Sequence, residues 1–348
     1  MKTLIFLSAF AIVGSCANKS YKEKIEDIKS NISLESPENA KIYSETITAN
    51  ELKDHLVIFS SAKFEGRAIG TKGQKLAAQY LENYYMTENI QSPLGGNDYF
   101  QNIPKSFFGA NYNNSENVLA FIKGSEAPEE VIIISGHFDH EGVNNEGEIH
   151  YGADDNGSGT SAILEIAQAF QKAKDDGFGP KRSVAFLHTT AEEIGLHGSR
   201  FYTENPVFSL DQTVANLNID MIGRIDERHL KENNDNYIYL IGSNRLSTEL
   251  HYISEAVNQN FPKLDLNYHY NSLDDPRRYY YRSDHYNFAK HNIPVIFYFN
   301  GEHDDYHKPT DTPDKIFYPL LEKRAKLIFA TAWQLANQEQ RIEVDKAN

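Results

Sequence analysis

The segment Val131-Ile-Ile-Ile-Ser-Gly-His137-Phe-Asp139 decides the fold, because an apolar β-branched run ends directly in a histidine and a carboxylate. A short run of this kind is typical of a strand that is buried on both faces of a sheet. Similar runs recur, with helical stretches between them, at residues 183–188, 214–219, 237–241 and 294–299. This alternation predicts an α/β fold in which helices cover both faces of one mostly parallel, twisted sheet.

Helices are predicted where apolar residues recur at intervals of three and four. The strongest examples are residues 73–85, 158–174 and 320–337. Thr48-Ala-Asn-Glu51 fits a capping box that begins a further helix. The polar, Asn- and Gly-rich residues 87–116 are predicted to be mainly loop. No repeat or Pro/Gly linker divides residues 46–340, so we expect a single domain over this range.

The composition excludes several classes of function. The chain has 348 residues, of which 40% are hydrophobic, so it can bury a large core. Its 49 acidic and 34 basic residues give a formal net charge of −15, and such a surface repels the phosphates of nucleic acids. The single cysteine cannot form an intrachain disulfide. No apolar run of about 18 residues follows the N-terminus, so no membrane-spanning helix is predicted.

The N-terminus has the parts of an export signal. Met1-Lys-Thr precedes a short apolar run, and Val-Gly-Ser-Cys16 follows it and resembles a bacterial lipobox. We therefore expect a signal peptide over residues 1–15, a lipidated Cys16 and a polar tether over residues 16–45, in which a short helix near 21–31 is allowed. The protein would then be exported and lipid-anchored in the cell envelope, touching the membrane only through Cys16. The alternative is a buried N-terminal helix.

Candidate metal ligands follow the predicted strands at the points where the strands end. These residues are His137 and Asp139, the pair Glu192-Glu193, Asp220, and the acid- and histidine-rich segment 302–307. In open α/β sheets the ligand site lies beyond the carboxyl ends of the strands. Several carboxylates at one edge would repel one another unless cations lie among them. Two divalent ions sharing a carboxylate could activate water, while one acid of the Glu192-Glu193 pair moves a proton.

Gly152-Ala-Asp-Asp-Asn-Gly-Ser-Gly159 lies between the first of these strands and its helix. Small residues there would let the backbone approach a metal closely, but an Asx-type turn that caps the helix explains the segment equally well. Gly157-Ser-Gly-Thr-Ser-Ala162 formally matches a dinucleotide fingerprint, but some twenty residues separate it from the preceding strand, which disfavours a dinucleotide site. The chain also lacks GxSxG and HExxH, which excludes a serine hydrolase elbow and a helix-borne zinc protease site.

Five motifs in a fixed order resemble those of the co-catalytic di-zinc aminopeptidases of metallopeptidase clan MH, the bacterial leucyl-type enzymes. They are Ser-Gly-His137-Phe-Asp139, Gly-Ala-Asp154-Asp155-Asn-Gly-Ser-Gly, Ala-Glu192-Glu193-Ile-Gly, Asn-Ile-Asp220-Met-Ile-Gly and Tyr306-His307-Lys-Pro-Thr-Asp. The likeness covers residues 46–340 and includes Phe64-Glu-Gly-Arg67 and Arg282-Ser-Asp-His285. It implies a zinc-exopeptidase fold that acts on peptide substrates.

The resemblance also implies a set of metal ligands for two divalent ions, zinc above all. It assigns His137 and Asp220 to one ion, Glu193 and His307 to the other, and Asp154 to both. His303, four residues before His307, competes for the last position, but the sequence context around His307 matches the family better.

Other residues receive supporting roles from the same resemblance. Glu192 would be the general base and later the acid to the leaving amine. Asp139 would orient His137 without binding an ion itself. Asp155 would lie next to the bridging residue, and the Asp154–Asp155 peptide would be cis. Tyr306 would donate a hydrogen bond to the oxyanion of the transition state.

The function expected from the resemblance is removal of N-terminal residues from peptides by a metal-activated water. A carboxypeptidase or dipeptidase on the same metal core remains open, as does a glutaminyl-cyclase-like acyltransferase, which the resemblance says uses one zinc. A silent binding lipoprotein is the alternative outside enzymes, although it would have no need of Glu192. The cluster Arg277-Arg-Tyr-Tyr-Tyr-Arg282 reads either as a loop that lines the substrate site or as a Tyr-rich surface turn.

Overall fold

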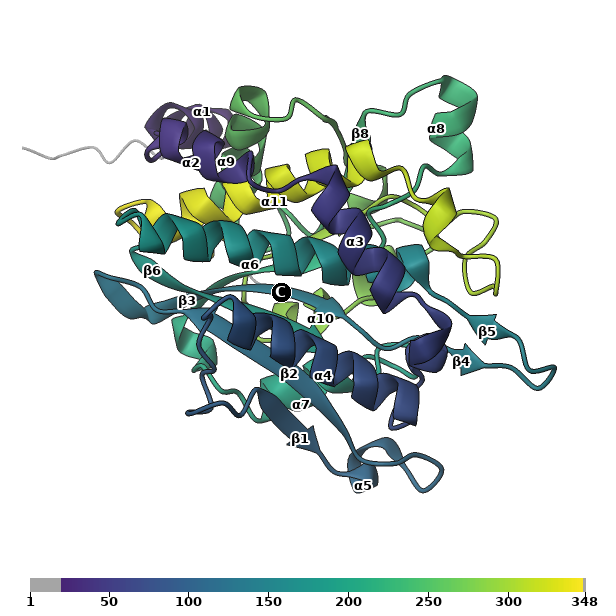
Figure 1. The fold of residues 1–348 in the computed structure, drawn as a ribbon. Helices are drawn as coiled ribbons and strands as arrows, with labels where there is room; N and C mark the ends of the chain where they lie inside the picture. Colours follow the sequence, from purple (N-terminus) through teal and green to yellow (C-terminus); the bar gives the residue numbers. More distant parts are fainter. Residues whose placement is uncertain (1–19, 347–348) are drawn as a thin grey trace, which may run out of the picture.

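One eight-stranded sheet forms the centre of the computed structural model, which describes residues 20–346 (Figure 1). The strand order across the sheet is β1-β2-β6-β3-β7-β10-β8-β9. The bounds are β1 Phe100–Ile103, β2 Ser115–Ile122, β3 Ala127–His137, β6 Arg182–Thr189, β7 Thr213–Ile219, β8 Tyr237–Ile241, β9 Asp265–Asn267 and β10 Val295–Phe299. A separate two-stranded hairpin pairs β4 Gly142–Val143 with β5 Ile149–His150.

The middle of the sheet is parallel and its flanks are mixed. β6, β3, β7 and β10 pair in parallel, whereas β1, β2 and β8 pair antiparallel to their inner neighbours. All five strands predicted from apolar runs are present, and the predicted α/β class is confirmed. Because the parallel strands share one direction, their carboxyl ends lie along one edge of the sheet.

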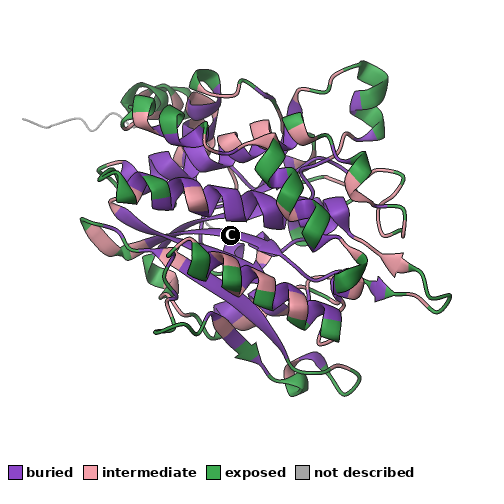
Figure 2. Ribbon diagram, viewed as in Figure 1, coloured by how far each residue is buried: buried purple, intermediate pink, exposed green. Residues whose placement is uncertain are grey.

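Helices cover both faces of the sheet and separate the apolar core into two layers. Alternate residues of β3 show the division, since Ile132 and Ile134 pack into one layer and Val131 and Ile133 into the other. The first layer lies under α3 Ala49–Phe59, α4 Lys72–Thr87, α6 Gly159–Asp175, α9 Thr248–Asn260 and α11 Tyr318–Asn337. The second lies under α7 His197–Glu204 and α10 His285–Ala289. In Figure 2 the inner strands of the sheet are buried and the outer surfaces of the front helices are exposed.

Residues 20–45 differ from the polar tether that the sequence predicts. They form α1 Tyr21–Asn31 and α2 Pro37–Ser44, and α2 packs on the domain. Tyr43 is buried and stacks on Trp333 with ring centroids 5.9 Å apart, and Trp333 Nε1 donates to the carbonyl of Glu35. The sequence analysis missed this packing because the segment is mostly polar and only a few of its apolar side chains contact the domain. The folded unit therefore begins before residue 46.

The segment 87–116 contains more structure than predicted. It holds β1, the short helix α5 Lys105–Phe108 and the start of β2. β2 was missed because its first residues, Ser115-Glu-Asn117, are polar, and they are buried only because β1 and β6 lie on either side. The remaining helix, α8 Glu227–Glu232, follows β7 on the surface.

The expected signal peptide and Cys16 lie outside the described residues. Within residues 20–346, none of the helices combines the length and the apolar character needed to cross a bilayer.

Candidate metal centre

The predicted ligands meet at the carboxyl edge of the parallel strands. His137 is the last residue of β3, Asp220 directly follows β7, and Glu192 and Glu193 lie in the loop after β6. His307 comes from the long loop after β10. Segments far apart in sequence therefore deliver their side chains to one place, as the strand assignments predict.

The first group of candidate ligands is centred on His137. Its Nε2 lies 3.2 Å from Asp155 Oδ1 and 3.4 Å from Asp220 Oδ1. All three side chains are at least nine-tenths buried. Imidazole nitrogen and carboxylate oxygen are the donors that zinc takes in catalytic sites, so this trio can hold one ion.

The second group is centred on His307 and shares Asp155 with the first. His307 Nε2 lies 3.1 Å from Asp155 Oδ2 and 3.1 Å from Glu193 Oε2. The two oxygens of Asp155 thus face different histidines. A carboxylate placed in this way can bridge two divalent ions.

Asp154 does not occupy the bridging position that the resemblance assigned to it, and this is a correction. Its Oδ1 accepts a 2.7 Å hydrogen bond from the backbone N–H of Gly223, and its Oδ2 lies 3.1 Å from His303 Nε2. Asp155, expected beside the bridge, is the residue between His137 and His307. The cis peptide is likewise one position further along, between Asp155 and Asn156. Since both residues are aspartates, sequence alone did not distinguish them.

The charges in the site fit bound cations. Burial opposes protonation of His137, but the carboxylates of Asp220 and Glu192 raise its pKa well above the usual value. Burial likewise opposes protonation of His307, and hydrogen bonds to Asp155 and Glu193 raise its pKa to about 11. The carboxylates are thus balanced by protons on the histidines. A metal ion supplies positive charge at the same nitrogens, so the residues present fit two divalent ions.

Glu192 lies beside the two groups of candidate ligands, but its carboxylate takes no part in the contacts of 3.1–3.4 Å described above for His137 and His307. Burial raises its pKa well above the usual value, and the neighbouring carboxylates of Asp220 and Glu193 add to the shift. Its backbone N–H donates to Asp139 Oδ1 at 3.2 Å. The carboxylate of Asp139 is 3.7 Å from His137 Nδ1, and the Asp139 carbonyl is closer, at 3.2 Å. Asp139 therefore contacts both His137 and the chain at Glu192.

Further side chains hold the candidate ligands, and the sequence analysis did not assign them this role. Ser283 Oγ donates to Asp220 Oδ2 at 2.6 Å, and His140 Nδ1 lies 2.7 Å from Glu193 Oε1. Glu141 lies between His150 and His307: its Oε2 is 2.8 Å from His150 Nδ1 and its Oε1 is 3.2 Å from His307 Nδ1. Ser283 lies within the Arg282-Ser-Asp-His285 stretch of the resemblance, and His140 and Glu141 directly follow Asp139. This proximity is the one signal for them in the sequence.

Comparison with known proteins agrees with this geometry. Residues 117–332, well over half of the chain, match the sequence profile of peptidase family M28. The chain belongs to this family. All the residues of the candidate metal centre lie within the matched range.

Individual relatives in the family cover the chain only in part. Aminopeptidase YwaD of Bacillus subtilis is 24% identical over 240 residues, which is 67% of this chain and 47% of YwaD. Glutamate carboxypeptidase 2 homolog of Caenorhabditis elegans is 35% identical over 108 residues, 30% of this chain and 13% of that protein. The chain thus spans less than half of the length of these curated relatives.

Solved structures show the same fold at low sequence identity. The LapA aminopeptidase of Legionella pneumophila superposes with a TM-score of 0.67 at 20% identity, over 88% of this chain and 77% of that one. A zinc aminopeptidase from Bacillus subtilis gives 0.63 at 16% identity, over 86% and 99%. A glutaminyl cyclase of Bacteroides thetaiotaomicron gives 0.62 at 14% identity, over 82% and 98%. Aminopeptidases and a glutaminyl cyclase therefore share this fold, so the fold by itself does not distinguish between these activities.

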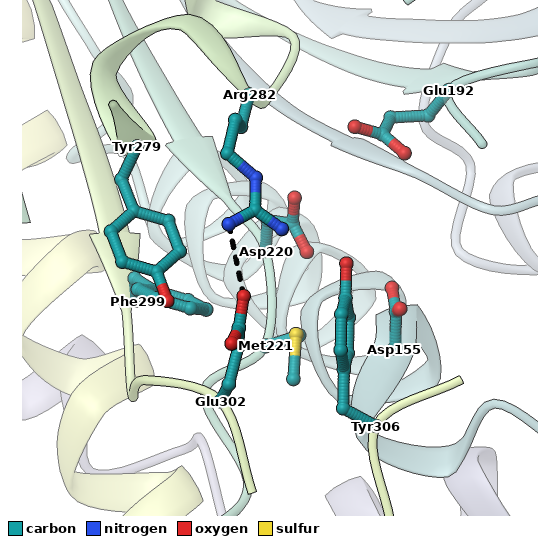
Figure 3. A pocket seen from close by; sticks show the side chains of 9 residues that line it. All are labelled: Asp155, Glu192, Asp220, Met221, Tyr279, Arg282, Phe299, Glu302 and Tyr306. Atoms are coloured by element: carbon teal, nitrogen blue, oxygen red, sulfur yellow. Dashed lines mark hydrogen bonds and ion pairs between the residues drawn. The ribbon is translucent and has the colours of Figure 1, made fainter. Parts of the chain in front are cut away.

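A pocket opens beside the candidate metal centre of this M28 chain (Figure 3). Its wall consists of Asp155, Glu192, Asp220, Met221, Tyr279, Arg282, Phe299, Glu302 and Tyr306. Tyr306 stands beside Asp155 with its hydroxyl in the pocket. Burial raises the pKa of Tyr306, and the carboxylates of Asp155 and Glu193 add to the shift, so the hydroxyl stays protonated and can donate a hydrogen bond. The Arg277–Arg282 segment thus lines the site in part, through Tyr279 and Arg282.

Proposed function

We propose that the chain is a metal-dependent aminopeptidase that hydrolyses N-terminal residues from peptides. The observation that carries the proposal is the position of Asp155, whose two carboxylate oxygens face His137 and His307 at 3.2 and 3.1 Å. Glu192 and an adjoining pocket complete the arrangement. Membership of a peptidase family and a fold shared with bacterial aminopeptidases support the same assignment.

Two divalent ions, expected to be zinc, would be held by five residues. His137, Asp155 and Asp220 would bind one ion, and Asp155, Glu193 and His307 the other. Bound there, the ions supply Lewis-acid chemistry: they polarise the scissile carbonyl and make water more acidic.

The side chains around the ions then have separate tasks. Glu192 takes a proton from the attacking water and passes it to the amine that leaves, a role that suits a carboxylate with a raised pKa. The Tyr306 hydroxyl donates a hydrogen bond to the oxygen that becomes negative in the transition state. Asp139 orients His137, and Ser283 orients Asp220 through its 2.6 Å hydrogen bond.

A carboxypeptidase or dipeptidase is the second candidate, because the matched Caenorhabditis elegans relative is named a glutamate carboxypeptidase homolog. A glutaminyl-cyclase-like acyltransferase shares the fold, but a full set of ligands for two ions argues against a one-ion site. A binding lipoprotein without catalysis has no use for Glu192 beside the ions.

The test is hydrolysis of aminoacyl anilides, N-blocked peptides and glutaminyl peptides by protein whose metal content is measured by mass spectrometry. We expect about two ions per chain and cleavage of substrates with a free α-amine only. Glu192→Gln should abolish turnover while metal is retained, and Glu204→Gln, at an exposed side chain at the end of α7, is the matched control. Cleavage of N-blocked peptides would favour the carboxypeptidase, and activity that survives in Glu192→Gln would exclude the role of Glu192.

The proposed site of action is the cell envelope. Signal-peptide cleavage before Cys16 and acylation of that cysteine would tether the peptidase domain to a membrane. Metabolic labelling with a tagged fatty acid tests this: the wild-type chain should be labelled and Cys16→Ser should not. A labelled Cys16→Ser protein, or an unlabelled wild type, would contradict the anchor.

A further inference from the structure

The pocket beside the metal centre has one cationic residue in its wall. On the side away from Glu192 the wall is formed by Arg282, Tyr279 and Phe299 (Figure 3). Arg282 follows the short 3₁₀ turn Tyr279–Tyr281, and Phe299 is the last residue of β10. If the scissile peptide group of a substrate lies at the candidate metal centre, the side chain of the first residue or the following part of the peptide therefore lies near Arg282.

Arg282 is held in place by its neighbours. Its Nη1 donates to Glu302 Oε1 at 2.9 Å, and its guanidinium lies 4.7 Å from the centre of the Tyr279 ring. The second oxygen of Glu302 accepts a 2.9 Å bond from Arg277 Nη1, which also donates to the Tyr279 hydroxyl at 2.9 Å. Two guanidinium groups thus share one carboxylate, and this trio of side chains carries one net positive charge.

The Arg282 guanidinium keeps unused donors on the pocket side. A guanidinium has five N–H donors, and the bond to Glu302 uses one of them. The side chain is 41% exposed, so the remaining donors are accessible. Figure 3 shows the other terminal nitrogen directed away from Glu302, toward the side of the pocket with Asp220 and Tyr306. The fork geometry of arginine matches carboxylates and phosphates, and of these two groups an unmodified peptide offers the carboxylate.

We infer that Arg282 binds a carboxylate of the substrate, so that the enzyme prefers peptides whose first residue is aspartate or glutamate. The inference rests on the proposed aminopeptidase function. Tyr279, Phe299 and Met221 supply apolar contacts for the methylene groups of such a side chain. A C-terminal carboxylate, as in a dipeptide, has the same chemistry and is the other source that the pocket could accept.

A basic first residue is disfavoured by the same contacts. Both oxygens of Glu302 are engaged by Arg277 and Arg282, so an incoming lysine would compete with two arginines for one carboxylate. It would also bring its own charge beside Arg282. Like charges placed this close repel each other.

The test compares charged and neutral side chains of one shape. Full-length, metal-loaded protein is assayed with glutamyl, glutaminyl, leucyl and lysyl anilides. We expect kcat/KM to be higher for glutamyl than for glutaminyl anilide. Arg282→Met should lower this ratio by about 10- to 100-fold, the range for loss of a hydrogen bond to a charged group. Arg278→Met is the matched control, since Arg278 stacks on Tyr281 and does not line the pocket.

A second variant separates binding from a merely structural role. Glu302→Gln removes the negative charge beside Arg282 and should raise the glutamyl-to-glutaminyl ratio, the opposite of Arg282→Met. A change in the same direction for both variants would mean that only the loop had been disturbed, and would overturn the inference.

The source of the carboxylate is identified with a pair of dipeptides, Leu-Gly and Leu-Gly-amide. A preference for Leu-Gly that Arg282→Met removes, with equal glutamyl and glutaminyl rates, would assign the site to the C-terminal carboxylate. If Arg282→Met changes neither ratio, Arg282 binds no carboxylate and the inference fails while the aminopeptidase stands. If the wild type cleaves none of the free-amine substrates, the proposed function itself fails.

Discussion

Asp154 and Asp155 are adjacent in the chain, yet their carboxylates contact different histidines: Asp154 Oδ2 lies 3.1 Å from His303 Nε2, and Asp155 Oδ2 lies 3.1 Å from His307 Nε2. Only the Asp155 carboxylate also contacts His137. The two aspartates therefore have separable functions, one in the fold around the site and one between the candidate ions.

Substitution of each aspartate by asparagine should separate these functions. Asp155→Asn removes a negative charge shared by both ions, so bound metal should fall from about two ions per chain to fewer than one. Asp154→Asn keeps an oxygen that can accept from the Gly223 N–H, so it should retain both ions. Metal content by mass spectrometry after dialysis is the measurement. Loss of metal in Asp154→Asn but not in Asp155→Asn would restore Asp154 as the bridge.

Glu141 should determine how tightly the ion at His307 is held. Its carboxylate is 3.2 Å from His307 Nδ1, the nitrogen that does not face Asp155 and Glu193. A carboxylate in this position fixes the ring and makes its other nitrogen a stronger ligand, and its loss commonly costs 10–100-fold in metal affinity. We expect Glu141→Gln to weaken one of the two ions by about tenfold or more in a chelator competition.

Glu146→Gln is the control for this experiment, because Glu146 lies in the same hairpin and its side chain is exposed. Equal metal affinities for Glu141→Gln and Glu146→Gln would show that Glu141 does not act on His307. Circular dichroism of the metal-free variants separates a change in affinity from unfolding.

The central sheet could be predicted because its inner strands are continuous apolar β-branched runs. Such a run is typical of a strand whose two faces are both buried. The flanking strands β1, β2 and β9 could not be predicted in this way. β2 begins with polar residues that are buried between β1 and β6, and β1 and β9 are short strands that lie at the edges of the sheet and remain partly exposed. The helix α2 was also not predicted, because only a few of its residues are buried, among them Ala40 and Tyr43, which stacks on Trp333. Local pattern determines the interior of this fold, and partner contacts determine its margins.

The candidate site divides in a similar way. Residues at strand ends, such as His137 and Asp220, are placed by the strand itself and were predicted. The Asp154 carboxylate is engaged by the Gly223 N–H at 2.7 Å and by His303 Nε2 at 3.1 Å, which leaves the Asp155 carboxylate between His137 and His307. Asp311 Oδ2 holds the backbone of both residues by accepting from their N–H groups at 2.9 and 3.1 Å. Asp311 is more than 150 residues away in sequence. Contacts between residues so far apart in sequence position the two aspartates, and no local pattern in the sequence indicates them.

Arg67 should be essential for stability, because it is fully buried and joins three segments around the site. Its guanidinium donates to the carbonyls of Phe59, Phe138, Tyr151 and Gly152 at 2.8–3.1 Å. Arg67→Met leaves these acceptors without donors and should lower the free energy of unfolding by about 3–5 kcal/mol. Urea unfolding of the metal-free protein measures the change.

Arg228→Met is the matched control for Arg67, since Arg228 pairs with Glu232 one turn along α8 and both side chains are exposed. An exposed pair of this kind contributes at most about 1 kcal/mol. A loss of similar size in Arg67→Met would mean that water replaces the guanidinium at little cost, and would remove Arg67 from the framework of the site.

His285 should make stability depend on pH below neutrality. The ring is fully buried and stacks on Phe297 with centroids 4.9 Å apart, and burial lowers the pKa of His285 to about 3. In the unfolded chain the imidazole takes up a proton near its usual pKa of about 6.5, while the folded protein binds none until the pH approaches 3. The unfolded state therefore gains protons first, and stability falls as the pH drops from about 6.5 toward 3.

His285→Phe keeps a ring against Phe297 and removes the titrating group, so it isolates this effect. The free energy of unfolding of the variant should fall less steeply with decreasing pH, by up to about 1.4 kcal/mol per pH unit below pH 6. Unfolding is measured in urea from pH 7 to pH 4.5 with a chelator present, because loss of metal at low pH would otherwise add its own slope. Parallel curves for the wild type and the variant would show that His285 is protonated in the folded protein, in conflict with its burial against Phe297.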